Sequence, residues 1–317
     1  MAGVLCAACA LAQQTPAEAL IEAGHWKRAR TIVEARIKEA PGDALANFLL
    51  SQIRNAFGDR TTPLPLAEKA VALDGRTAKY HRQLAEVIGV TAQHANPIQQ
   101  LVLARRFKNE IKIALSLDPN DRQALRDQVE FYLLAPGIAG GDLRRAGEVA
   151  ARLGEVDPVE GLLARARIAA VRKDALAEQD LLRQAAEARP ASYRAAVALA
   201  QFHLGRGDLR AAEAPAAAAV QLDPHRAEGY GILATVYAGG GQWDKLDAIL
   251  AAAAQEVPDD LVPYYRAAER LAADDPARAE RYIRIYLGQE PEGNEPTIQD
   301  ANRILSRVRG GGTSSRP

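Results

Sequence analysis

The stretch Ala227–Asp260, AEGYGILATVYAGGGQWDKLDAILAAAAQEVPDD, decides the fold of this chain. Its apolar residues recur every three or four positions in two runs, separated by Gly239-Gly240-Gly241. This spacing is typical of two amphipathic helices joined by a tight turn. Ala234 and Ala253 put a small side chain in each run, where it lets a neighbouring helix approach closely. The stretch therefore predicts one antiparallel helix pair, closed by Pro258, which cannot continue a helix.

The same unit recurs along the chain. Its closing turns fall at Pro41, Gly75, Pro119, Pro158, Pro190, Pro224, Pro258 and Pro291, with gaps of 34, 44, 39, 32, 34, 34 and 33 residues. A period near 34 indicates a two-helix repeat, and one such unit cannot bury its apolar face alone. We therefore predict an all-α solenoid of about seven or eight helix pairs, ending in a capping helix near residues 296–308.

The unit resembles the tetratricopeptide repeat. The matching positions in 227–260 are Tyr230, Leu233, Ala234, Tyr237, Gly241, Trp243, Leu246, Leu250, Ala253 and Pro258. Ala234 stands in the position usually held by glycine, and Leu246 stands in one usually held by alanine. The resemblance implies a right-handed solenoid that binds other proteins.

The middle of the chain resembles a narrower group. Residues 77–157 look like bacterial exported tetratricopeptide proteins that carry an extended unit and then an APG-x-x-GG turn, here Ala135–Gly141. This resemblance implies export, and it implies no chemistry.

The N-terminus gives a second indication of export. MAGVLCAACALAQQ contains an apolar stretch followed by Ala10-Leu11-Ala12, a small-x-small cleavage pattern. We predict a signal peptide over residues 1–12, cleavage after Ala12, and a periplasmic or secreted protein without cysteine, since Cys6 and Cys9 would be removed. The alternative is that these residues complete the first helix, which would leave a cytoplasmic protein. The solenoid is expected over 13–309, with a flexible tail over 310–317.

Charge and motifs exclude several functions. Lysine and arginine number 40, and aspartate and glutamate also number 40, so the basic excess of a general nucleic-acid binder is absent. None of the five histidines is spaced i, i+4 from another, as a helical zinc site requires. We expect no catalytic residue, metal or cofactor, and no membrane-spanning segment in the mature chain.

Two adjacent units, over about residues 76–158, are enlarged. They measure 44 and 39 residues, and the extra length falls between the two helices of each unit. We predict helices over 77–94 and 97–117, then an ordered turn. The two insertions are expected to meet in one insertion edge, formed by His94, Pro136, Gly137, Ile138, Gly140 and Gly141. This edge either binds a partner or only stiffens the array.

The concave surface is predicted from repeat position. In the enlarged units its first-helix positions carry a dense mixture of charges: Lys79, Arg82, Gln83, Glu86, Arg126, Asp127 and Glu130. Such a surface suits an extended peptide or a partner helix. The alternative is a solvated face with ion pairs within each helix, Arg82 with Glu86 and Arg126 with Glu130.

These observations predict a non-enzymatic, exported scaffold or assembly factor that holds a protein or peptide partner in its concave groove. The rival prediction is an enzyme, or a small-ligand-binding protein, whose site lies in the insertion edge and uses Glu86, Glu130 or His94.

Overall fold

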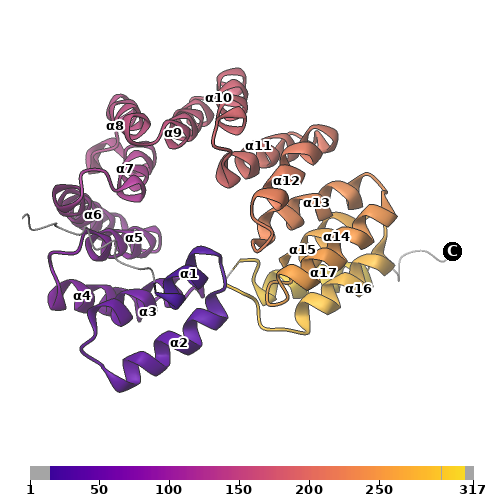
Figure 1. Ribbon diagram of the computed structural model, residues 1–317, viewed down its shortest axis with the longest axis horizontal. Helices are drawn as coiled ribbons and strands as arrows, with labels where there is room; N and C mark the ends of the chain where they lie inside the picture. Colours follow the sequence, from indigo (N-terminus) through magenta and orange to yellow (C-terminus); the bar gives the residue numbers. More distant parts are fainter. Residues whose placement is uncertain (1–14, 294, 311–317) are drawn as a thin grey trace, which may run out of the picture.

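The computed structural model describes residues 15–293 and 295–310, and every regular element in these residues is helical (Figure 1). The predicted signal peptide and nearly all of the predicted tail lie outside the described residues. In chain order the helices are α1 (Pro16–Glu22), α2 (Trp26–Glu39), α3 (Ala44–Ala56), α4 (Pro63–Leu73), α5 (Ala78–Gln93), α6 (Pro97–Leu117), α7 (Arg122–Leu134), the 3-10 helix η1 (Gly137–Ala139), α8 (Leu143–Val156), α9 (Pro158–Val171), α10 (Ala175–Glu187), α11 (Tyr193–Gly205), α12 (Leu209–Leu222), α13 (Ala227–Gly239), α14 (Trp243–Glu256), α15 (Val262–Leu271), α16 (Pro276–Leu287) and α17 (Ile298–Gly310).

The first sixteen α-helices form eight pairs, and α17 covers the last pair, as predicted. Each helix packs on its neighbours in the chain, and the first helices of successive pairs, from α3 to α15, also contact one another. The helix boundaries predicted for α5 and α6 are confirmed to within one residue. The chain is therefore one continuous solenoid whose first helices lie together.

Local sequence sets the helix ends. The turn between α11 and α12 combines a glycine with positive φ and an aspartate that caps the next helix: Gly207 has φ 75°, and Asp208 accepts a hydrogen bond from the amide of Ala211. Lys173 occupies the same place before the cap Asp174 with φ 59°, where a side chain is strained. At the start of the described chain, Thr15 and Glu18 form a reciprocal capping box that fixes the start of α1.

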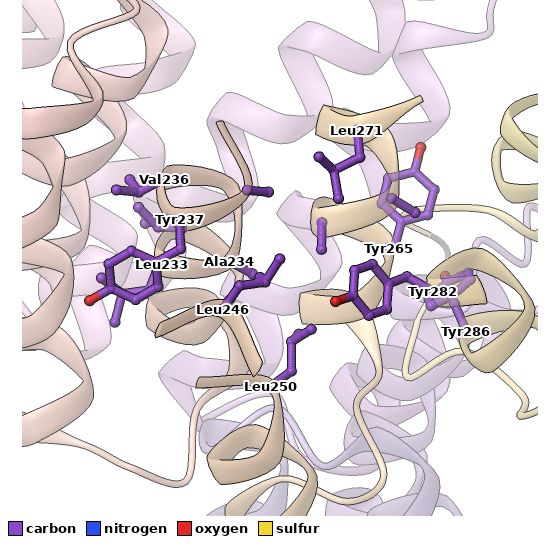
Figure 2. Packing of buried hydrophobic residues seen from close by; sticks show 14 of the residues in the cluster. Leu233, Ala234, Val236, Tyr237, Leu246, Leu250, Tyr265, Leu271, Tyr282 and Tyr286 are labelled. Atoms are coloured by element: carbon purple, nitrogen blue, oxygen red, sulfur yellow. The ribbon is translucent and has the colours of Figure 1, made fainter. Parts of the chain in front are cut away.

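Small residues occupy the helix contacts, as the repeat predicts. Ala85, Ala200, Ala234 and Ala268 are fully buried on the first helices, and Ala114, Ala185 and Ala219 are fully buried on the second helices. In the C-terminal pairs, larger side chains fill the space around these contacts. Figure 2 shows Leu233 and Tyr237 of α13 with Leu246 of α14, and Tyr265, Tyr282 and Tyr286 on the side of α15 and α16.

The two enlarged units pack against each other through α6. This helix has 21 residues, and its Phe107 ring stacks on Phe131 of α7 with ring centroids 5.2 Å apart. The short helix η1 also contacts α6. Gly141 must be glycine here, because a Cβ would lie 1.8 Å from the carbonyl oxygen of Ala135.

The solenoid curves round until its two ends meet. Figure 1 shows α1 and α2 beside the chain segment that joins α16 to α17. The Nζ of Lys27 donates to the carbonyl oxygens of Asp259 (2.7 Å) and Glu290 (2.8 Å). Arg30 makes a two-bond pair with the Glu290 carboxylate at 3.0 and 2.9 Å, and Arg28 pairs with Asp259. We call this set of contacts, together with Glu292, the clasp.

Glu292 completes the clasp by capping α2 from the far end of the chain. His25, at the N-cap of α2, makes no side-chain capping bond. Instead the backbone N–H of Lys27 donates to both oxygens of Glu292, at 3.3 and 3.4 Å. This N–H would otherwise lack a helical partner, and the helix N-terminus favours a negative charge. Burial nevertheless raises the pKa of Glu292 to about 7, although Lys27 opposes the shift.

The contact between Gly154 and Gly161, where α8 meets α9, gives a direct test of the packing. A Cβ on Gly161 of α9 would lie 2.3 Å from the Cα of Gly154 in α8. We expect Gly161→Ala to destabilise the protein by about 1–3 kcal/mol, because backbone must move. Gly147→Ala in α8 is the control, since its Cβ would meet nothing within 4 Å; it should stabilise by about 0.5–1 kcal/mol. Urea unfolding measures both, and equal effects would contradict the packing described.

The clasp should respond to pH. The pKa of Glu292 is about 7 in the closed form, above its ordinary value of 4.5. Its contribution to the stability of the closed form is therefore complete below about pH 4.5 and is lost as the pH rises through about 7. We expect the radius of gyration, measured by small-angle X-ray scattering, to rise between about pH 5 and pH 8 more in the unaltered protein than in Glu292→Gln.

The comparison with Glu292→Gln isolates this group from its neighbours. Burial lowers the pKa of His25, so this group favours the closed form as the pH rises, opposite to Glu292. Burial raises the pKa of Asp260, so this group disfavours the closed form as the pH rises, as Glu292 does. Arg30 holds the pKa of Glu290 below its ordinary range. Both proteins share these groups together with Lys27, Arg28 and Asp259, so an identical pH response in the two would contradict the role given to Glu292.

Candidate functional site: an arginine–carboxylate groove

A groove of about 720 Å³ runs along the inner faces of α7, α9 and α11. Three of the residues predicted for the concave surface line it: Arg126, Asp127 and Glu130. The facing positions of the next two first helices complete it. We call this cavity the groove.

A buried carboxylate lies at the centre of the groove. Glu160 of α9 is only 8% exposed, and its Oε1 lies 3.0 Å from Arg126 Nη1 of α7 and 3.5 Å from Arg194 Nη1 of α11. Its Oε2 has no hydrogen-bond partner among the described residues. Burial raises the pKa of Glu160 even with Arg126 beside it. Glu160 thus lies between two arginines, although its Oε2 accepts no hydrogen bond from the described residues.

A second charge pair crosses the groove. Arg167 Nε of α9 donates to both oxygens of Glu130 on α7, at 3.0 and 3.3 Å, and both side chains are about half exposed. The pairing expected within α7, Arg126 with Glu130, is not made; each residue pairs with α9 instead. Arg82 and Glu86 do approach within 3.8 Å in α5.

The floor of the groove is apolar. Leu163, Ala166 and Ala170 of α9 and Ala198 and Phe202 of α11 line it. The groove therefore combines hydrogen-bond donors and acceptors at its walls with a shallow apolar base. An extended peptide requires both, because its backbone presents N–H and C=O groups and its side chains alternate.

The other four predicted groove residues lie outside the groove and contact neighbouring helices. Arg82 and Gln83 are buried, and Gln83 donates to Ser51 of α3 at 3.4 Å. Lys79 pairs with Glu18 of α1 at 2.6 Å, and Glu86 accepts from Asn55 at 3.2 Å. The expectation of an open surface is thus corrected for Arg82 and Gln83, because the adjacent first helices come close enough to bury them, whereas Lys79 and Glu86 stay partly exposed.

Asp127 links the groove to this buried region. Its Oδ2 has no hydrogen-bond partner among the described residues. Burial raises its pKa to about 7; Glu86 and Asp121 add to the shift, whereas Arg82 and Arg126 oppose it. Burial therefore favours the protonated form of this side chain well above the pH at which an exposed aspartate loses its proton.

A second cavity, of about 1040 Å³, lies beside the clasp. The inner face of α13 contributes Glu228, Ile232 and Thr235 to this chamber, and Arg266 and Glu269 of α15 continue it. These are the concave positions of the repeat. His94, which was predicted to belong to the insertion edge, also lines the chamber.

The residues named for the rival enzyme site have the following surroundings. Glu86 is engaged by Asn55, Glu130 by Arg167, and His94 lies at the chamber. In the described part of the chain, no group of three or more His, Cys, Asp or Glu side chains could hold a metal ion. Over the same residues, no helix is long and apolar enough to cross a membrane.

Glu160 and Arg167 were not among the predicted concave residues, although both occupy inner positions of the repeat. Counted back from the small residue Ala166, the inner positions of α9 are Glu160, Leu163, Ala164 and Arg167, and all four line the groove. Applying the same phase to every unit would have found them.

The buried carboxyl of Asp127 gives a stability test. Its folded pKa is raised, so its contribution to stability is complete below about pH 4 and falls as the pH rises through about 7. We expect Asp127→Asn to raise the urea midpoint at about pH 8, with a smaller gain at about pH 5. A gain that does not depend on pH would show that Asp127 does not titrate in this range.

No known family model matches the chain, and no curated protein matches it significantly. Among solved structures, it is similar to yeast Tom70, with a TM-score of 0.60 and 13% identity over 95% of this chain; it spans 65% of the length of that chain. It also matches a tetratricopeptide repeat protein from Parabacteroides merdae, with a TM-score of 0.46 and 12% identity over 92% of this chain and 96% of that one. The eight helix pairs, their buried small residues and the match in fold show that this chain is an all-α tetratricopeptide repeat solenoid.

Proposed function

We propose that this protein is a non-enzymatic scaffold that holds an extended segment of a partner protein in the groove. The observation that carries the proposal is the set of charge contacts between helices on the groove wall, Arg126–Glu160–Arg194 and Glu130–Arg167. The Glu130 carboxylate is about half exposed, so it can also accept a hydrogen bond from a peptide N–H of the partner.

The arginines supply the complementary half of the recognition. Arg194 and Arg167 are about half exposed, so each can present further N–H groups to backbone carbonyls or to an acidic side chain of the partner. The apolar floor then accepts the partner side chains that point inward. This division of roles suits a peptide better than a small molecule, because the contacts extend over three helices.

Export belongs to the same proposal. It is supported by the apolar stretch and the Ala10-Leu11-Ala12 pattern in residues 1–12, and by the resemblance of residues 77–157 to exported repeat proteins. The partner would then be a periplasmic or secreted protein. The alternative of an enzyme or small-ligand site in the insertion edge is not favoured, because Glu86 and Glu130 are each engaged by a side chain of a neighbouring helix.

The test is in-cell crosslinking of the full chain with a C-terminal tag, read by mass spectrometry. We expect the double variant Arg167→Glu/Arg194→Glu to lower partner recovery about ten-fold or more, since each change reverses a charge in the groove. Arg183→Glu/Arg210→Glu is the control; it makes the same charge change on α10 and α12, the second helices of their pairs, and should leave recovery unchanged.

Undiminished recovery by the groove variant would overturn the groove assignment, and absence of any reproducible partner would overturn the scaffold. The same spectra locate the N-terminus of the tagged chain. A chain that begins at Gln13 would support export, and a chain that retains residues 1–12 would refute it.

A further inference from the structure

Exposed apolar side chains gather on the enlarged units. Among the described residues, five bulky apolar side chains are at least 60% exposed, and four belong to these units: Ile98 (78%), Val102 (60%), Leu134 (63%) and Ile138 (83%). Ile98 and Val102 lie on the first turns of α6, whereas Leu134 and Ile138 flank the turn into η1. Neither the groove nor the chamber includes any of them. The proposed binding of a partner in the groove does not use these four exposed apolar side chains.

Uncompensated cations lie on the same face of α6. Ile98, Val102, Arg105, Asn109 and Lys112 follow one another at three- and four-residue spacing, so they form one stripe, and all five are exposed. Arg105, Lys108 and Lys112 make no ion pair within the described residues, unlike Arg106, which pairs with Glu68. From 87 to 109 the chain has no acidic residue.

The packing of η1 brings the two parts of this surface together. The Cβ position of Gly140 lies 3.9 Å from Lys108 Nζ, and η1 contacts α6. Ile138 is therefore held beside the cationic half of α6. Along α6 itself, Ile98 and Arg105 are about 10 Å apart. We call Ile98, Val102, Leu134, Ile138, Arg105, Lys108 and Lys112 the edge surface.

We propose that the edge surface docks the protein peripherally on an anionic lipid bilayer. An anionic bilayer interface accepts inserted apolar side chains and offers headgroup phosphates beside them, which matches exposed apolar side chains that lie next to unpaired cations. The residues of the edge surface line neither cavity, and a fluid lipid surface needs no complementary shape. The net charge of the whole chain is zero, so attraction to an anionic membrane must come from such a local excess.

Vesicle flotation of the full chain tests this proposal. At low ionic strength we expect the protein to float with vesicles of phosphatidylcholine and phosphatidylglycerol, and not with phosphatidylcholine alone. Arg105→Gln/Lys108→Gln/Lys112→Gln should lower the partition coefficient on the order of a hundred-fold. Ile98→Ser/Ile138→Ser should lower it about ten-fold or more, because two apolar side chains no longer insert. Residues 1–12 are the same in every variant, so they cannot cause a difference in vesicle binding between the variants.

Two control variants match these changes elsewhere on the surface. Lys38→Gln/Lys69→Gln/Arg210→Gln removes three exposed cations from α2, α4 and α12, and Leu176→Ser removes an apolar side chain that is 83% exposed on α10. Both should float like the unaltered protein. Absence of flotation, equal binding to neutral vesicles, or equal losses in control and edge variants would each overturn lipid docking. Absence of flotation would also favour an acidic protein segment as the occupant of the edge surface.

Discussion

Close approach of neighbouring helices through alanine is the constraint on which the rest of this structure depends. Where Ala85, Ala200 and Ala234 lie in the helix contacts, the backbones come near enough for one repeat to cover the apolar face of the next. The same closeness brings the inner side chains of successive first helices within ion-pair distance. Arg126 thus reaches Glu160, and Arg167 reaches Glu130, although each pair joins different repeats. The groove is a consequence of the packing.

The balance of charge follows from the same geometry. Acidic and basic residues are equal in number, and inside the curve they are matched locally across helices. The matching is incomplete at Asp127 and Glu160, where burial raises the pKa and one carboxyl oxygen lacks a hydrogen-bond partner. A buried carboxyl oxygen without a hydrogen-bond partner costs stability, so the packing of the surrounding helices must offset this cost.

The sequence predicts the fold well because its evidence is local. Periodicity and turn residues placed α5 and α6 to within a residue, and the phase of the repeat placed Arg126, Asp127 and Glu130 on the inner face. The prediction of an open surface failed for Arg82 and Gln83. The phase of the repeat gives the direction in which a side chain points, but it does not give the distance to the next helix. The sequence contains no local signal for the clasp at all. Lys27 and Glu292 are 265 residues apart, and their meeting depends on small rotations added over every repeat.

The clasp also changes the physics of the repeat. An open solenoid behaves as a linear chain of units, each stabilised by two neighbours except at the ends, where fraying begins. Joining α2 to the segment before α17 gives the first unit a second neighbour and turns the linear chain into a loop. Unfolding from either end must then break contacts between residues more than 230 positions apart, which raises the contact order and couples the outermost units. A repeat protein closed in this way should lose its structure as a single cooperative body, and a partner can enter the enclosed space along the axis of the loop or after the clasp has opened.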